Sequence, residues 1–182
     1  MIVHYHSLQQ KGELLPSLWQ AFMADDTPPW LWGYAPPPTL TEFVIGFSAM
    51  ERHLFVVLTP EGTDFVGALW IDEISWGHRA RAHFYFFPRY RNQRVLRVAV
   101  ACQRVLRVLA NPPFNLRTLL FFISHEAEDA QRMATKFGVT FVGDIPDYYP
   151  DGHVARIGYR SLEQNKNLNL TPNVRSEESN RV

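Results

Sequence analysis

Residues 79–93 read RARAHFYFFPRYRNQ. Positions 79–87 alternate between a polar and aromatic set and an apolar set, which predicts a strand with two different faces. The polar and aromatic face holds Arg79, Arg81, His83, Tyr85 and Phe87. Pro88 ends this strand, because proline lacks the N–H group that a strand ladder requires, and a short basic loop is expected at residues 89–93.

The residues that follow predict a helix and then a buried strand. Apolar side chains in residues 93–110 recur at i, i+3, i+4 and i+7, which is typical of an amphipathic helix. Its other face carries four arginines, Arg94, Arg97, Arg104 and Arg107. Residues 116–124 are almost continuously apolar, as expected of a strand buried on both faces.

Further elements are expected on either side of this region. Before it, we expect a strand at residues 1–6, a helix at 7–23 that Pro16 kinks or splits, a helix capped by Thr39 or Thr41, and strands at 53–59 and 64–72. After it, we expect a helix at 126–137 and strands at 139–142 and 154–160. The order is β-α-α-β-β-β-α-β-α-β-β, an α/β (α+β) fold with a mixed, mostly antiparallel sheet of about seven strands and flanking helices.

Composition favours one domain, residues 1–162, followed by a polar C-terminal tail at 163–182 that cannot fold alone. The net charge of zero conceals a segregation: residues 1–73 sum to −7, residues 74–125 to +9 and residues 126–182 to −2. All nine cations of the central block are Arg. Cys102 is expected in the core, and no secretory signal or membrane span is apparent.

The element order resembles that of the GNAT family, the Gcn5-related N-acetyltransferases. Two further stretches resemble the family. Residues 84–93 are similar to its fourth strand and the Pro-x-x-Arg entry to its acetyl-CoA loop, and residues 131–143 to a helix that runs into a Gly-aromatic strand. The resemblance implies an N-acetyltransferase that takes acetyl-CoA. The residues themselves favour a cytoplasmic protein without a metal, because no export signal is apparent and the pair His4 and His6 has no third ligand in view.

The resemblance also marks positions that depart from the family pattern. Aligning Arg91 with the family's leading Arg places Arg94 and Leu96 where the pyrophosphate loop carries Gly. Ala127 then takes the place of a frequent Asn, and Ala134 that of the Tyr that protonates the departing thiolate. Cofactor contacts are therefore expected from Arg89, Arg91 and Arg94, which offer charge-assisted hydrogen bonds to phosphate.

Proton transfer would then fall to other side chains. His83 and Tyr85 on the fourth strand, and Glu73 after the third, are the candidate catalytic residues. The alternative is that His83 and Tyr85 are sheet residues with satisfied hydrogen bonds and that Glu73 is a solvated turn acid. Trp30, Trp32 and Tyr34 form either a substrate gate or a loop pinned by packing.

The arginine face has three interpretations: an ordinary solvated face, a CoA-binding face, or a docking surface for an acidic protein or nucleic acid. The second function hypothesis is therefore a catalytically degenerate GNAT-fold interaction or assembly module that docks through Arg94, Arg97, Arg104 and Arg107 and the tail. Degenerate proteins of this fold occur in tailed bacteriophages, some within particles. A chain of phage origin would then be found in a virion, and an oligomer or protein partner is plausible.

Overall fold

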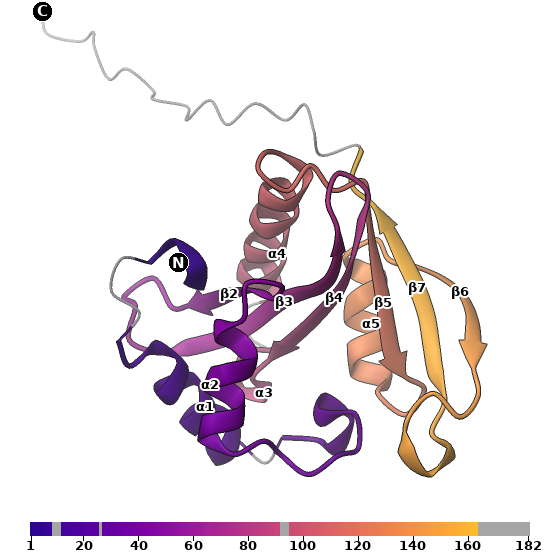
Figure 1. Cartoon of the computed structure of the whole chain (residues 1–182), viewed down its shortest axis with the longest axis horizontal. Helices are drawn as coiled ribbons and strands as arrows, with labels where there is room; N and C mark the ends of the chain where they lie inside the picture. The colour runs from indigo at the N-terminus through magenta and orange to yellow at the C-terminus, as the bar shows by residue number, and fades with distance from the viewer. Residues whose placement is uncertain (9–11, 26, 92–94, 164–182) are drawn as a thin grey trace, which may run out of the picture.

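The computed structural model describes residues 1–8, 12–25, 27–91 and 95–163. Figure 1 shows a curved sheet with helices on both of its faces. The described strands form a seven-stranded sheet in the order β1-β2-β3-β4-β5-β7-β6. All neighbouring strands are antiparallel except β4 and β5, which are parallel. The predicted fold class is confirmed.

The elements follow the predicted order. The first part of the chain contains β1 (Ile2–His4), α1 (Leu14–Ala24), α2 (Leu40–Ser48), β2 (His53–Leu58), β3 (Phe65–Ser75) and β4 (Arg79–Phe86). The second part contains α3 (Pro88–Arg91), α4 (Val95–Ala110), β5 (Thr118–Ser124), α5 (Glu128–Lys136), β6 (Thr140–Ile145) and β7 (Ala155–Ser161). Short 3-10 turns among the described residues are η1 (Tyr5–Ser7), η2 (Pro29–Trp32) and η3 (Pro150–Gly152).

Three local expectations were wrong. Pro16 does not kink a helix, because α1 begins at Leu14 and a first-turn proline removes no helical hydrogen bond. A helical turn, α3, stands where a basic loop was expected. β5 alternates between buried and half-buried residues, so only one of its faces is fully covered.

Two layers of helices cover the sheet. One face packs against α1 and α2 through side chains such as Leu18, Phe22 and Tyr85, each at most 1% exposed. The other face packs against α4 and α5 through Leu109 and Leu119, both 2% exposed. Burying one such Leu or Phe contributes about 2 kcal/mol of transfer free energy.

β4 and β5 pair over only a short distance. Their parallel register runs from Arg79↔Thr118 to Arg81↔Leu120. β5 is instead paired with β7 along its whole length, from Thr118 to Ser124. The strands therefore diverge after Arg81, which leaves the β4 edge from Ala82 onward available to a ligand.

Three histidines meet beside the first two strands. Nε2 of His4 lies 3.2 Å from Nδ1 of His53, and the His6 ring is 5.2 Å from that of His53. His4 also stacks on Phe55 at 4.6 Å. Burial, followed by repulsion from His53 and His6, lowers the pKa of His4 to about 4.

We expect the free energy of unfolding to fall as the pH is lowered from about 6.5 to about 4, because the unfolded chain binds a proton at His4 that the folded protein excludes. The loss is about 1–2 kcal/mol after allowance for the partly exposed ring. Urea unfolding of His4→Gln should lack most of this dependence, whereas the exposed His78→Gln should retain it. An unchanged pH dependence in His4→Gln would contradict this assignment.

Candidate functional site

A cavity of about 270 Å³ lies where β4 and β5 diverge. Arg81 to Phe84 line it from β4, and Phe121 to Ser124 from β5. The segment around Trp30 and Gly33, Ala130 of α5, and the paired Tyr148 and Tyr149 complete the lining. Segments far apart in the sequence thus converge on the gap between the two parallel strands.

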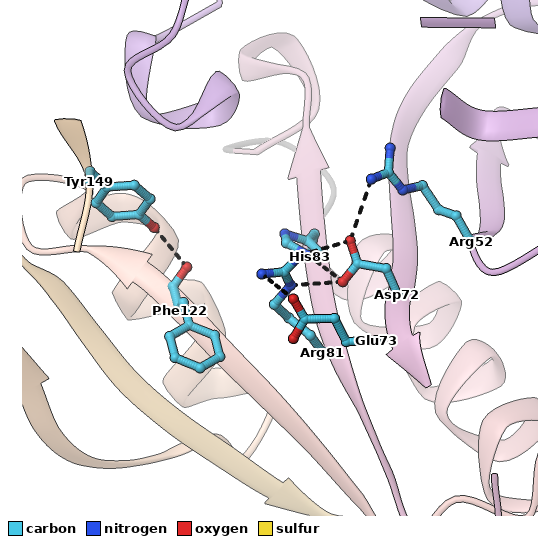
Figure 2. A network of polar contacts seen from close by, with 7 residues as sticks. All are labelled: Arg52, Asp72, Glu73, Arg81, His83, Phe122 and Tyr149. Atoms are coloured by element: carbon cyan, nitrogen blue, oxygen red, sulfur yellow. Dashed lines mark hydrogen bonds and ion pairs between the residues drawn. The ribbon is translucent and has the colours of Figure 1, made fainter. Parts of the chain in front are cut away.

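A buried carboxylate organises one wall of this cavity (Figure 2). Asp72 is 7% exposed, and Arg81 donates two hydrogen bonds to it, at 2.8 and 3.3 Å. Nε2 of His83 lies 3.2 Å from Asp72 Oδ1, and Arg52 forms a longer ion pair with Oδ2 at 3.7 Å. Cross-strand register explains the cluster, because Asp72 of β3 stands directly opposite Arg81 of β4.

The environment fixes the ionisation of Asp72. Burial alone would raise its pKa, but the hydrogen bonds and charges of His83 and Arg81 lower the pKa well below the usual range. An ionised carboxylate only accepts hydrogen bonds, so Nε2 of His83 carries the proton that Asp72 accepts. In the neutral imidazole, Nδ1 then holds the free lone pair.

His83 is also held by its neighbours. Its ring stacks on Trp70 with the ring centroids 5.1 Å apart and the planes 4° apart. Trp70 and His83 stand opposite each other across β3 and β4, so the stack follows from the register. The imidazole is therefore oriented by a ring face and by a carboxylate, an arrangement suited to proton transfer.

Tyr149 lies across the cavity from this cluster, as Figure 2 shows. Its hydroxyl donates to the carbonyl of Phe122 at 3.0 Å. Burial, together with Tyr148 and Tyr34, raises the pKa of Tyr149 to about 12, so the phenol stays protonated. Tyr149 was not predicted from the sequence, because it lies in an irregular segment with no periodic pattern.

The proline-rich loop around Trp30 and Gly33 borders one side of the cavity. Trp30 and Gly33 line the cavity, whereas Trp32 packs against Phe22 and donates to Thr27 at 3.2 Å. The packing interpretation therefore describes Trp32, and a gate at Trp30 stays a prediction. Gly33 has φ +62°, a left-handed conformation that lets the chain turn back over the site.

A polar clasp ties this segment to β5 and to the loop before β7. The Tyr34 hydroxyl lies 2.5 Å from Ser124 Oγ and 3.0 Å from Glu126 Oε2. The Tyr34 ring stacks on His153 at 3.7 Å, and Nδ1 of His153 lies 2.9 Å from Glu126 Oε1. These contacts of Tyr34 hold the loop that contains Trp30 and Gly33 in place beside the cavity.

The three candidate catalytic residues occupy different places. His83 lines the cavity. Tyr85 is 1% exposed and donates to Asp25 at 2.8 Å, within the core formed with α1. Glu73 lies at a register irregularity with φ +48°, and its exposed carboxylate pairs with Arg81 at 2.8 Å. Asp72, which the sequence analysis did not single out, is the carboxylate that contacts His83.

Solved structures share this architecture. The spermidine N-acetyltransferase of Vibrio cholerae in complex with CoA and spermine aligns with a TM-score of 0.70 and 13% identity, over 91% of this chain and 96% of that chain. A dodecameric structure of the enzyme from that organism aligns at 0.66 with 14% identity, over 92% and 96%. The spermidine/spermine N-acetyltransferase of Vibrio cholerae in complex with manganese ions aligns with a TM-score of 0.63 and 14% identity, over 90% of this chain and 93% of that chain.

The chain has the GNAT fold. At this level of identity the likeness concerns the fold alone. No protein-family model and no characterised protein matches the sequence itself. The GNAT resemblance inferred from residues 84–93 and 131–143 is thus confirmed at the level of structure.

The arginines expected to bind CoA are only partly described. Arg94 lies outside the described residues, as do the side chains of Arg91 and Arg97. The Arg89 guanidinium is 3.9 Å from Asp64 and lies over the rings of Phe87 and Tyr90. Arg89 is 57% exposed and remains accessible to a phosphate.

The channel between β4 and α5 is narrow. A space of about 10 Å³ remains between Phe84 and Phe86 on β4 and Ala130 and Met133 on α5, with Trp30 beside it. The cavity between β4 and β5 is large enough for an acyl group, whereas passage of a longer chain between β4 and α5 would require Met133 or Trp30 to move.

The two alanines at family positions are buried. Ala127, the N-cap of α5, is 3% exposed, and Ala134 is fully buried. Neither side chain carries an exchangeable proton, so these positions provide no acid for a leaving thiolate.

Within the described ranges, no group of three His, Cys, Asp or Glu side chains is arranged to hold a metal ion. No described helix is both long enough and apolar enough to cross a membrane.

We expect Met133→Ala to lower the Kd for acetyl-CoA at least threefold, because truncating this side chain widens the channel beside β4. Thermal unfolding should show a cost of about 1–2 kcal/mol for the partly buried side chain. The matched control is Met50→Ala, since Met50 is 72% exposed. An unchanged Kd in Met133→Ala, measured by titration calorimetry, would show that Met133 does not restrict the channel.

Proposed function

We propose that the protein transfers an acyl group from acetyl-CoA to an amine in the cavity between β4 and β5. The observation that carries this proposal is His83, which lines the cavity and is held by Asp72 and stacked on Trp70. The GNAT fold adds support, because the similar solved structures include an N-acetyltransferase in complex with CoA.

His83 acts as the general base. The amine nitrogen attacks the thioester carbonyl carbon, the C–N bond forms, and the C–S bond breaks. The proton lost by the nitrogen passes to Nδ1 of His83, directly or through one water, while Asp72 stabilises the resulting imidazolium. The imidazolium then supplies the proton that the departing thiolate takes up.

The unpaired part of β4 receives the donor. Backbone N–H and C=O groups beyond Arg81 are not paired with β5 and are available to the amide groups of an extended donor. At the other end of the ligand, Arg89, Arg91 and Arg94 are proposed to contact phosphates. Tyr149 lines the opposite wall, where its hydroxyl donates a hydrogen bond to the carbonyl of Phe122.

Release of free thiol from acetyl-CoA in the presence of a mixture of primary amines tests this function. Ala130→Leu places a larger side chain into the cavity lining and should reduce the rate at least tenfold. Thr135→Leu adds the same side chain to an exposed position of α5 and should have no effect. Equal rates in both variants would place the reaction elsewhere.

The alternative function, an interaction or assembly module, has its own support. Arg104 is exposed on α4, and the buried Nε of Arg107 has no hydrogen-bond partner among the described residues. The narrow channel beside β4 also favours this alternative. Changing Arg97, Arg104 and Arg107 to Glu should then abolish association with an acidic partner, while association that survives would exclude this face as the contact.

A further inference from the structure

The cavity between β4 and β5 is lined mainly by rings. Seven of its fifteen lining residues are Trp, Tyr or Phe, among them Trp30, Phe122 and Tyr148. These rings already form planar stacks in the wall: Phe122 lies parallel to Tyr148 at 5.0 Å with 7° between the planes. Flat apolar faces of this kind favour a ligand that is itself flat and apolar.

The same lining offers no free anionic group. Among the described lining residues, Arg81 is the side chain with a fixed charge, and it is a cation. Asp72 behind it is shared by Arg81, His83 and Arg52, and Glu73 pairs with Arg81.

Glu126 follows Ser124 outside the lining, and its carboxylate is 62% exposed. Glu126 accepts from Tyr34 and contacts His153. A second ammonium group held within the lining would therefore lose hydration without meeting an acidic side chain among its described residues. Contact with a ring face is worth about 0.5–2 kcal/mol, less than the several kcal/mol that desolvating an unpaired charge costs.

The size of the space agrees with this chemistry. A dry cavity of roughly 150 Å³ is enough to bind benzene. At about 270 Å³, the cavity has room for one ring system and for the acyl group beside His83. Trp30, Leu31 and Gly33 line one side of the space, and the hydrogen bond of Tyr34 to Ser124 holds their loop beside it.

Building on the proposed acyl transfer, we infer that the acceptor is a primary amine carried on an aromatic body, and not a polyamine. The reacting nitrogen lies near His83, and the ring packs between Trp30 and the Phe122–Tyr148 stack. This substrate class differs from the spermidine and spermine named for the similar solved structures, although the fold is the same.

Titration calorimetry of the full chain with 2-phenylethylamine and with spermidine tests the inference without requiring turnover. We expect a Kd for 2-phenylethylamine at least tenfold below that for spermidine. Tyr148→Ala should weaken 2-phenylethylamine binding about tenfold, and Tyr159→Ala, at an exposed tyrosine of β7 outside the cavity lining, should not. Spermidine binding as tight as or tighter than 2-phenylethylamine, or no difference between the two variants, would overturn the inference.

A separate titration with acetyl-CoA keeps this inference distinct from the proposed function. If acetyl-CoA binds and spermidine is the better ligand or substrate, the acceptor class is wrong and acyl transfer stands. If acetyl-CoA does not bind, acyl transfer is wrong, and the preference between the two amines still shows whether the cavity selects an aromatic ligand.

Discussion

Replacing His83 with Gln lowers kcat for acetyl transfer by about 10²–10⁴-fold, the range expected when a general base is removed. The amide can still donate to Asp72, so the wall of the cavity is preserved and the Kd for acetyl-CoA changes little. Added imidazole should restore part of the rate, which a purely structural role for His83 would not allow.

The matched control is His78→Gln, at an exposed turn position. Its kcat should equal that of the unaltered protein. A His83→Gln protein that retains kcat within threefold, or one that imidazole does not rescue although it folds and binds acetyl-CoA normally, would show that His83 is not the base.

Asp72→Asn lowers the free energy of unfolding by about 2–3 kcal/mol. The carboxylate is 7% exposed and faces Arg81, His83 and Arg52, so its removal leaves partly buried cations without their shared anion. The control, Asp64→Asn, removes an exposed partner of Arg89 and should cost less than about 1 kcal/mol.

The loss of unfolding free energy in Asp72→Asn should depend on pH. The pKa of Asp72 is lowered in the folded protein, so its contribution is complete above the unfolded value of about 4 and is lost as the pH falls further. Urea unfolding should therefore show a constant difference between Asp72→Asn and the unaltered protein from pH 5 to 8, and a smaller one below pH 4. A difference that disappears already between pH 5 and 7 would contradict the ionised state of Asp72.

Local patterns were enough to predict most helices and strands and their order along the chain. The alternation of residues 79–87 placed His83 and Arg81 on one face of β4. Of the two caps expected for α2, Thr39 and Thr41, the structure shows Thr39, which forms a capping box with Glu42. The strand order could be inferred only through the resemblance, because pairing between distant strands leaves no local signal. The turn α3 was missed because the basic residues 89–93 carry no apolar period.

The site was harder to predict. Asp72 could have been recognised as an acid next to the buried residues Trp70 and Ile71, but its partners follow from the β3–β4 register, which the sequence did not provide. Tyr149 and Tyr34 come from loops whose path is set by tertiary contacts. Tyr85 shares a strand face with His83, yet it packs into the core, because α1 covers that end of the strand and Asp25 binds its hydroxyl.

The most direct test of acyl transfer between β4 and β5 is a calorimetric titration of the full chain with acetyl-CoA. We expect saturable binding with one site per chain, weakened at least tenfold by Ala130→Leu and unaffected by Thr135→Leu. No binding at millimolar acetyl-CoA, or binding that Ala130→Leu leaves unchanged, would contradict it.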